Sequence, residues 1–274
     1  KEARHQSRLF GRIVTHLFSI MLSRDKRKGY RPRQTPEPLT PDMMTPEEIQ
    51  GRILYRDALM LVINKPAGIA VHEAHPNAKS RGNHMEQFFP HLSFGLPQPP
   101  MLAHRLDKDT SGCLVLGRHR KALDDLSRLF RDGKMEKTYW ALVRGGPQED
   151  EGFIDMPLGK MDRSKGWWMK PDPEGLPAQT GWRVMGRGEG MAWLELKPQT
   201  GRTHQLRVHC QAMGWPIIGD PIYGDGKQTG EMLHLHARAI LVPLYKNKPA
   251  IAVEAPPSPH MLPRLDACGY GAAH

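Results

Sequence analysis

Apolar and polar positions along the middle of the chain form short runs that predict strands. Residues 52–72 indicate two short strands around a turn. "LMLVIN" (59–64) has the continuous apolar character of a buried strand, and "KPAG" (65–68) is a turn signal. Further strands are predicted at 112–119 ("GCLVLGRH"), 134–145 ("KMEKTYWALVRG") and 152–159 ("GFIDMPLG").

Two segments have the apolar spacing of amphipathic helices. Residues 121–133 form the first, with Gly133 at the position of a helix stop. Residues 203–214 form the second, with Thr203 as its expected N-cap and Gly214 as its end. The expected apolar stripes are Leu123, Leu126, Leu129 and Phe130 in the first helix and Leu206, Cys210 and Met213 in the second.

A hairpin and a final strand complete the predicted elements. Residues 180–199 contain two β-like runs around the glycine-rich turn "GRGEG", and residues 233–244 are predicted to be the last strand. Residues 73–100 have little periodicity and are interpreted as a long loop. Many strands and few helices, without regular βαβ alternation, predict an α+β fold with a mainly antiparallel or mixed sheet.

Composition divides the chain into three parts. Residues 1–50 are predicted to be a flexible basic N-terminal extension and a proline-rich linker, because closely spaced prolines fix the backbone and remove donors. Residues 51–262 are the predicted folded domain, and residues 263–274 a C-terminal tail. Of the net charge of +10, residues 1–34 supply +8, from ten Lys or Arg and two acids. A polyanionic partner is therefore expected to meet the extension. A disordered arm with no specific role is the alternative interpretation.

Cysteine usage and hydropathy exclude several classes of protein. The chain has three cysteines and no CxxC pair, which argues against a disulfide framework and a zinc knuckle and favours a reducing compartment. No apolar run approaches the roughly 20 residues that cross a bilayer, so no membrane association is expected. A cytoplasmic location is predicted, although the Arg-rich, acid-poor start also has the character of an organellar transit peptide. No phosphate-binding glycine loop is present, so no nucleotide cofactor is expected.

The segment "HRLDKDTSG" (104–112) is too polar for a buried strand and lacks a helical period. If it is extended, Asp107 and Asp109 share a face at about 6–7 Å, a spacing that suits two carboxylates acting on a glycosidic bond. If it is a turn, one acid can be buried and the other solvated. Neighbouring Arg105 and Lys108 favour the ionised form of Asp107. A surface turn held by local hydrogen bonds is the alternative interpretation.

A second polar segment, "TGRTHQLRVH" (200–209), places His204, Arg207 and Gln211 on one face of the predicted helix. An arginine on that face can reach a carboxylate from another segment and hold it ionised where water is excluded. A solvated helix face is the alternative.

Histidines and tryptophans offer two further possibilities. "HLH" (234–236) can place two rings on one strand face, but no acid or cysteine accompanies them at a ligand-like spacing, so no metal site is expected. Trp167 and Trp168, beside Lys165 and Lys170, can form a stacking and phosphate-binding surface for nucleic acid, or simply pack at the rim of the core.

Taken together and in order, five segments resemble the catalytic domain of the RluA-type pseudouridine synthases. They are "NKPAGIAVH" (64–72), "HRLDKDTSG" (104–112), "KTYWALVRG" (137–145), "TGRTHQLRVHCQAMGWPIIGDPIYG" (200–224) and "LHLHARAI" (233–240). The resemblance implies the pseudouridine synthase fold, with a long mixed, mostly antiparallel sheet, flanking helices and a central RNA-binding cleft. It also implies isomerisation of uridine to pseudouridine in structured rRNA or tRNA by a monomer, with no cofactor, metal or obligate protein partner.

The resemblance assigns roles to individual residues. Asp107 matches the catalytic aspartate, Tyr139 the tyrosine that stacks on the target base and assists proton removal from C5, and Arg207 the basic residue paired with the aspartate. Arg105 matches a residue that occupies the space left by the flipped uridine. The remaining expected substrate contacts are His104, Thr110, Arg202, His204, Gln205 and Leu235. Arg202 is also the second choice for the basic residue paired with the aspartate, or a phosphate contact. Many relatives also carry an S4-type RNA-binding domain, for which residues 1–50 are too short and too proline-rich.

The chemistry requires a carboxylate beside the ribose. Pseudouridine formation breaks the C1′–N1 bond, turns the uracil and joins C1′ to C5. The carboxylate either attacks C1′ or removes the 2′ proton to give a glycal-like intermediate, and the sequence leaves both routes open. Two other functions compete: a hydrolase that uses Asp107 and Asp109 together, and a non-catalytic RNA-binding protein with the same fold.

Overall fold

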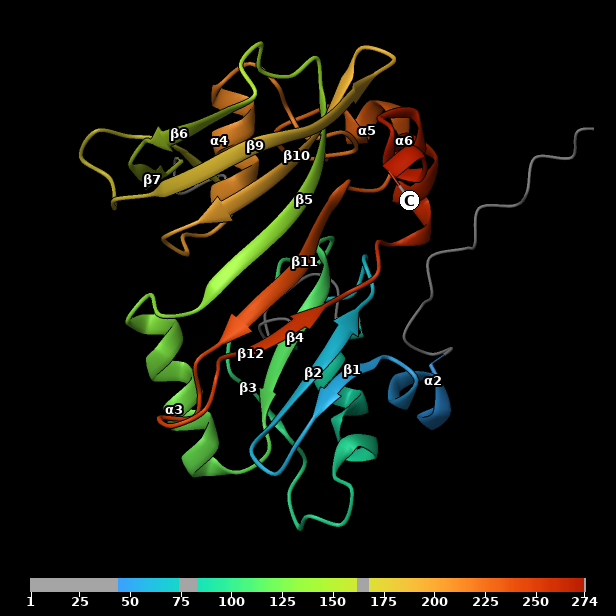
Figure 1. Cartoon of the computed structure of the whole chain (residues 1–274), viewed down its shortest axis with the longest axis vertical. Coiled ribbons are helices and arrows are strands. Elements are labelled where there is room, and N and C mark those ends of the chain that lie inside the picture. Colours follow the sequence, from blue (N-terminus) through green and yellow to red (C-terminus); the bar gives the residue numbers. More distant parts are fainter. Residues whose placement is uncertain (1–43, 74–82, 162–167, 274) are drawn as a thin grey trace, which may run out of the picture. The chain divides into compact units, whose positions relative to one another are not determined.

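The dominant feature of the structure, a computed structural model that describes residues 44–73, 83–161 and 168–273, is a ten-stranded sheet (Figure 1). Its order is β1-β2-β4-β11-β5-β10-β9-β6, with β12 beside β11 and β3 beside β4. Among the described pairs of this sheet, β4 with β11 is parallel and the others are antiparallel. The predicted α+β fold with a mixed, mostly antiparallel sheet is therefore confirmed.

The strands and helices have the following bounds. The strands are β1 (Ile53–Arg56), β2 (Met60–Lys65), β3 (Met101–Leu102), β4 (Ser111–Gly117), β5 (Glu136–Arg144), β6 (Glu151–Asp155), β7 (Leu158–Lys160), β8 (Met169–Pro171), β9 (Gln179–Gly188), β10 (Met191–Pro198), β11 (Leu235–Val242) and β12 (Ile251–Glu254). The helices are α2 (Pro46–Gln50), η2 (Met85–Leu92), α3 (Arg120–Arg131), α4 (Gln205–Ala212), α5 (Gly226–Thr229), η4 (Pro259–Met261), α6 (Leu262–Ala267) and η5 (Tyr270–Ala273). β7 and β8 pair with each other in a separate two-stranded sheet.

The large sheet carries a different core in each half. All seven residues of β4 are buried, which explains why this strand has a continuous apolar run rather than alternation. Side chains of α3 and η2 complete this core. In the other half, β5, β9 and β10 pack with α4 around Leu194, Leu206 and Trp215. β5 and β11 run between the two halves (Figure 1) and bring residues of both to the middle of the sheet.

Gly112 allows β4 to begin directly beside the parallel strand β11. Its φ of 104° favours glycine, and a Cβ there would lie 2.2 Å from the carbonyl oxygen of Ala237. The neighbouring Ser111 lies opposite His236, and the Ser111 Oγ is 2.8 Å from the His236 Nδ1. The end of the polar segment 104–112 is thereby fixed to the central strand.

The first predicted helix and the hairpin are confirmed. α3 places its predicted stripe against the core, and Gly133 follows it with a φ of 67°. The hairpin is β9 and β10, joined at Glu189 and Gly190, which both have positive φ. Such a turn matches the right-handed twist of the paired strands.

The predicted start of the second helix is wrong. α4 begins at Gln205, and its N-cap is His204, in the left-handed region with a φ of 54° and no side-chain cap bond. Thr203 instead lines a cavity, and the Gln205 side chain bonds the incoming loop. Met213 is 43% exposed rather than part of the apolar stripe, because the helix has already ended.

Three other boundaries differ from the sequence-based expectation. Residues 233–244 are not the last strand, because β12 follows and pairs with β11. Residues 152–159 span two strands, β6 and β7, separated at Met156 and Pro157. The expected loop 73–100 contains η2, whose Phe88 and Phe89 are buried.

Folded segments lie on both sides of the predicted domain limits at 51 and 262. Before residue 51, α2 is capped by Thr45 and buries Ile49 in the first core. After residue 262, α6 buries Leu265 against Trp193 and Met261. Residues 1–43, which hold most of the predicted extension and linker, lie outside the described residues.

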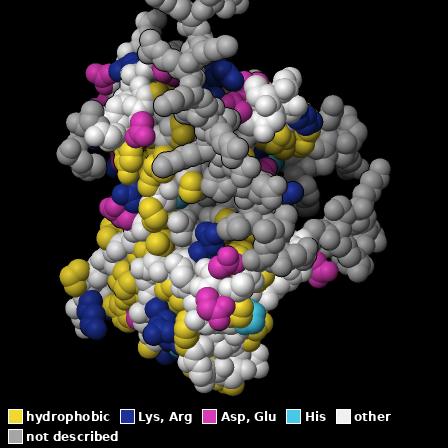
Figure 2. Space-filling view, turned by 90° about the vertical axis from the view of Figure 1, so that its right-hand side faces the viewer, with side chains coloured by type: hydrophobic (Ala, Val, Ile, Leu, Met, Phe, Trp, Pro, Cys, Tyr) yellow, Lys and Arg dark blue, Asp and Glu magenta, His cyan; other side chains and the backbone are white. Residues whose placement is uncertain are grey.

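The visible surface of the described residues carries mixed charge. In the view of Figure 2, Lys and Arg side chains are interspersed with Asp and Glu, and neither sign forms a continuous patch among the coloured atoms. This agrees with a net charge of +2 left for residues 35–274. Within the described ranges, no helix has both the length and the apolar character needed to cross a membrane.

Candidate active site

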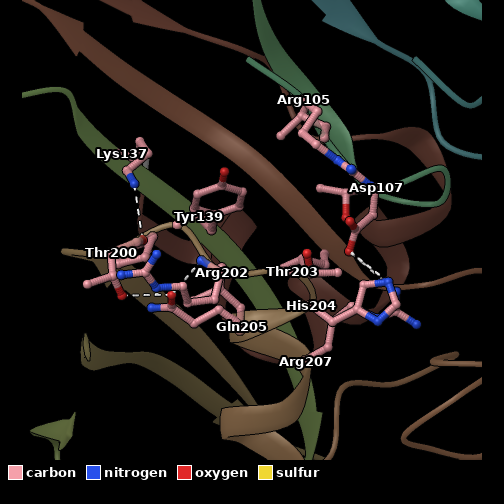
Figure 3. Close-up of a pocket in the computed structure, with 16 residues that line it drawn as sticks. Arg105, Asp107, Lys137, Tyr139, Thr200, Arg202, Thr203, His204, Gln205 and Arg207 are labelled. Atoms are coloured by element: carbon pink, nitrogen blue, oxygen red, sulfur yellow. Dashed lines mark hydrogen bonds and ion pairs between the residues drawn. The ribbon is translucent and has the colours of Figure 1, made fainter. Parts of the chain in front are cut away.

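A cavity of about 140 Å³ lies where the segment 105–110, β5, the loop 198–204, α4 and β11 meet. Nine of the ten residues predicted from the sequence line it: Arg105, Asp107, Thr110, Tyr139, Arg202, His204, Gln205, Arg207 and Leu235. Figure 3 shows Asp107, His204 and Arg207 at one end and Lys137, Thr200 and Arg202 at the other, with Tyr139 between them. We call these the Asp107 end and the Lys137 end.

The polar segment that carries Asp107 is a turn, so the extended alternative is excluded. The Thr110 amide donates to the Asp107 carbonyl oxygen at 3.2 Å. Asp107 keeps 20% of its side chain exposed to the cavity. Asp109 does not line the cavity. The two carboxylates are therefore not paired as a two-acid hydrolase requires.

Lys65 holds this turn from inside the protein. Its ammonium is fully buried and donates to the carbonyl oxygens of Pro66, Ile69 and Lys108 at 2.7–2.8 Å. Burial lowers the pKa of Lys65 to about 7, and nearby Asp109 and Asp107 oppose that shift. In the sequence this lysine belongs to a turn signal and to the segment 64–72, but it was given no role of its own. The feature of the sequence that could have singled it out is its position as the one charged residue at the end of the apolar run 59–64.

Arg207 joins two carboxylates at the Asp107 end. Its Nε and Nη2 bond the two oxygens of Asp220 at 2.7 and 2.8 Å, and its Nη1 is 3.4 Å from the Asp107 Oδ2. The Arg207 and Asp220 side chains are 4% and 1% exposed. Burial raises the pKa of Asp220, but the bonds and charge of Arg207 outweigh it, so the net shift is downward. The expected pairing of Arg207 with Asp107 exists, but Asp220, which the sequence reasoning missed, makes the closer bonds.

Asp220 also fixes the next loop. Its Oδ1 accepts the amides of Ile222 and Tyr223 at 2.8 and 3.0 Å. The Tyr223 hydroxyl then lies 2.9 Å from the His204 Nδ1, and the His204 Nε2 is 3.8 Å from the Asp107 Oδ2. Burial lowers the pKa of His204, with Asp107 opposing, so the ring is neutral at neutral pH. The left-handed backbone of His204 is thus over-determined by side-chain contacts, as strained residues at functional sites are.

Tyr139 reaches the middle of the cavity from β5. Burial and the nearby Asp107 charge raise the pKa of its phenol above the ordinary value. The phenol is therefore protonated at neutral pH. A ring at this position suits stacking on a planar group in the cavity. Its predicted part in removing a proton from C5 stays a prediction.

Gln205 and Arg202 shape the loop at the Lys137 end. The buried Gln205 amide accepts from the Thr200 Oγ1 and the Arg202 amide, and donates to the Gln179 oxygen and the Thr180 Oγ1. With these bonds made, Gln205 positions the loop rather than presenting its amide to a substrate. The Arg202 Nε donates to the Pro177 oxygen at 2.9 Å. Lys137, not selected from the sequence, also lines the cavity, and its Nζ donates to the Thr200 oxygen at 3.2 Å.

His104 is the one predicted substrate contact that does not line the cavity. Its Nε2 accepts the Val115 amide at 3.0 Å, and its ring stacks on Phe130 with centroids 4.3 Å apart. Burial lowers its pKa to about 3. His104 is therefore a neutral packing residue, and its assignment as a substrate contact is corrected.

Comparison with known proteins gives the family. Residues 59–212 match the model of the RNA pseudouridylate synthase family, so the chain belongs to this family of isomerases. It is 40% identical to an uncharacterized RNA pseudouridine synthase of Zymomonas mobilis over 75% of this chain and 93% of that protein. It is 35% identical to ribosomal large subunit pseudouridine synthase C of Haemophilus ducreyi over 84% of this chain and 73% of that protein. The structure of human RNA pseudouridylate synthase domain containing 4 superposes with a TM-score of 0.68 at 26% identity, covering 81% of this chain and 95% of that one. The resemblance to the pseudouridine synthases is confirmed.

Proposed function

We propose that this protein isomerises specific uridines of structured rRNA or tRNA to pseudouridine, with Asp107 acting on the ribose of a flipped-out uridine. The observation that carries the proposal is the arrangement at the Asp107 end. A partly exposed carboxylate faces the cavity while a buried guanidinium, itself held by Asp220, stands 3.4 Å behind it.

The arrangement suits a carboxylate that works as an anion in a site closed to water. Burial alone penalises a charged carboxylate, and an adjacent guanidinium offsets the penalty. Because Arg207 is fixed by two bonds to Asp220, it cannot swing away when substrate enters. The proposal gives Asp107 one of two roles, to attack C1′ or to take the 2′ proton.

Three other residues are assigned to holding the everted nucleotide. Taking a base out of its stack costs a few kcal/mol, and contacts to the base and to the gap it leaves offset part of that cost. The exposed Arg105, at the cavity mouth, is assigned to the gap, and Tyr139 to stacking on the uracil. Leu235 supplies apolar contact at the cavity wall.

The reaction is an isomerisation without net redox change, so the proposal includes no cofactor. The basic segment 1–34 is assigned to RNA, which its charge of +8 suits. The enzyme is proposed to act as a monomer in the cytoplasm. Ribosomal RNA is the first substrate to test, since one relative is named for the large ribosomal subunit.

The test is pseudouridine mapping of unmodified large-subunit rRNA and tRNA transcripts after incubation with the purified full chain. Conversion of a small number of defined uridines is expected, with no release of free uracil. Absence of pseudouridine from both RNA classes contradicts the proposal. Asp109→Asn distinguishes the hydrolase alternative: a two-carboxylate hydrolase loses its activity, whereas the synthase keeps most of it.

A further inference from the structure

Lys137 is the one cavity-lining cation of β5, and the chemistry above gives it no role. It lies two residues before Tyr139, so both side chains leave the strand on the same face. In Figure 3, Lys137 and Asp107 lie on opposite sides of Tyr139, and the Lys137 side chain points at the backbone of Thr200. Resting on the function proposed above, we infer that Lys137 stabilises the negative charge that the uracil carries after the C1′–N1 bond breaks.

The charge of Lys137 has little compensation inside the protein. Its described hydrogen bond goes to one carbonyl oxygen at 3.2 Å, and no carboxylate of the described residues lies within ion-pair distance of it. The side chain is half-buried, and this burial lowers its pKa. A desolvated ammonium without a counter-ion interacts strongly with any anion that enters the cavity. By contrast, Arg207 already bonds two carboxylates.

The reaction produces an anion that needs such a partner. When C1′–N1 breaks, the uracil leaves with the electron pair, and the charge spreads over N1, O2 and O4. The pair returns when C5 joins C1′, after which C5 loses its proton and N1 gains one, so the net change is an isomerisation. Tyr139 stacks on a ring face and carries no positive charge, so it cannot neutralise this intermediate.

The symmetry of uracil lets one fixed cation serve both halves of the reaction. Turning the ring about its N3–C6 axis exchanges N1 with C5 and C2 with C4. The carbonyl farthest from C1′ is therefore O4 before the turn and O2 after it. With the ribose at Asp107, that carbonyl points toward the other end of the cavity, where Lys137 lies. A donor at this position meets a carbonyl oxygen in substrate and product alike and holds the anion between them.

The test compares two leaving groups. RNA fragments that carry the mapped uridine are transcribed with uridine or 5-fluorouridine, and single-turnover loss of the N1-linked nucleoside is measured by nuclease digestion and mass spectrometry. Fluorine withdraws electrons and makes the uracil a better leaving group, so it needs less help from a cation. Lys137→Met is expected to slow the uridine reaction by about 10²- to 10³-fold, the usual effect of losing one oxyanion donor. The loss with 5-fluorouridine is expected to be at least tenfold smaller.

Two controls separate this role from a structural one. Lys134→Met removes an exposed lysine of the same segment and is expected to leave both rates unchanged. Lys137→Arg keeps the cation and is expected to retain more activity than Lys137→Met. If Lys137→Met lowers the melting temperature, Lys137→Gln, which keeps a donor for Thr200, is measured in its place.

Three results would overturn the inference. An equal loss for both leaving groups would show that Lys137 supports the fold of the site. A raised RNA Kd with an unchanged rate at saturation would assign Lys137 to a phosphate, and full activity of Lys137→Met would leave it no role. If the wild-type enzyme forms no pseudouridine, the proposed function itself fails, which is a separate outcome.

Discussion

The two ends of the cavity treat charge in opposite ways. At the Asp107 end, Arg207 lies between two carboxylates and is held by Asp220 through two bonds of 2.7 and 2.8 Å. At the Lys137 end, a half-buried ammonium has one carbonyl oxygen as its described partner. The first end is preorganised before RNA arrives, whereas the second is completed by what binds. The protein thus fixes the catalytic carboxylate before substrate binds. The inferred role of Lys137 is to stabilise the uracil anion, which exists only during the reaction.

The largest expected effect comes from removing the buried ion pair of Asp220 with Arg207 at the Asp107 end. Asp220→Asn leaves Arg207 buried with an incomplete partner, and breaking a buried ion pair typically costs about 3–5 kcal/mol. We expect a loss of that size in the free energy of unfolding, measured by urea titration. A fall of about 10²-fold in single-turnover rate is also expected, because Arg207 is no longer fixed behind Asp107.

A surface ion pair supplies the matched control for Asp220. Asp225 pairs with Arg144 where both side chains are about one-third or more exposed. Asp225→Asn is therefore expected to cost no more than about 1 kcal/mol and to leave the rate unchanged. Equal losses for Asp220→Asn and Asp225→Asn would contradict the idea that burial makes the Asp107 end special.

The next effect concerns the pH dependence of stability and a buried neutral histidine, His236, beside the start of β4. His236 is fully buried, bonds Ser111 at the start of β4, and has its pKa lowered to about 4 by burial. The unfolded chain binds a proton near pH 6.5, before the folded state does, so stability falls as the pH drops from about 6.5 to about 4. The expected loss is about 3 kcal/mol for this group.

Urea unfolding of wild type and His236→Gln at pH 7 and pH 4.5 checks this expectation. The variant starts from a lower stability, but its loss between the two pH values is expected to be smaller. An identical loss in both proteins would assign the acid sensitivity to other groups.

The smallest expected effect lies outside both ends of the cavity. Removing residues 1–34 takes away ten Lys or Arg and is expected to weaken RNA binding several-fold and flatten its salt dependence. The cut spares Met44, which is buried, and Thr45, which caps α2, so the melting temperature is expected to stay the same. Filter binding at several salt concentrations measures the RNA affinity and its salt dependence. An unchanged slope of log affinity against log salt concentration would show that the segment takes no part in RNA binding.

How far the sequence predicts the molecule depends on whether a contact is local. α3 and the β9–β10 hairpin follow from spacing and turn residues alone, and the structure confirms them. The start of α4 was misplaced because side chains from Thr200 and Tyr223, rather than a local cap, determine the conformation of its first residues. β12 was missed because its four residues lie between prolines that mark the end of the chain as irregular, although Ile251 and Val253 alternate as in a strand and pair with β11.

The site shows the same division. Sequence blocks brought together nine cavity residues, but they gave no account of Asp220, whose bonds to Arg207 join residues thirteen positions apart across a loop. Lys137 was within reach of sequence reasoning, since it shares a strand face with Tyr139. His104 was misassigned because the block around Asp107 was treated as one surface, whereas its first residue turns inward onto Phe130.

The most direct test of the account is Asp107→Asn, which keeps the size of the side chain and removes its charge. Single-turnover pseudouridine formation and RNA binding are measured on the same preparation, beside Asp109→Asn. The account predicts a rate reduced by on the order of 10⁴-fold or more for Asp107→Asn, with an unchanged RNA Kd and an active Asp109→Asn. Pseudouridine formation by Asp107→Asn at close to the wild-type rate would contradict it.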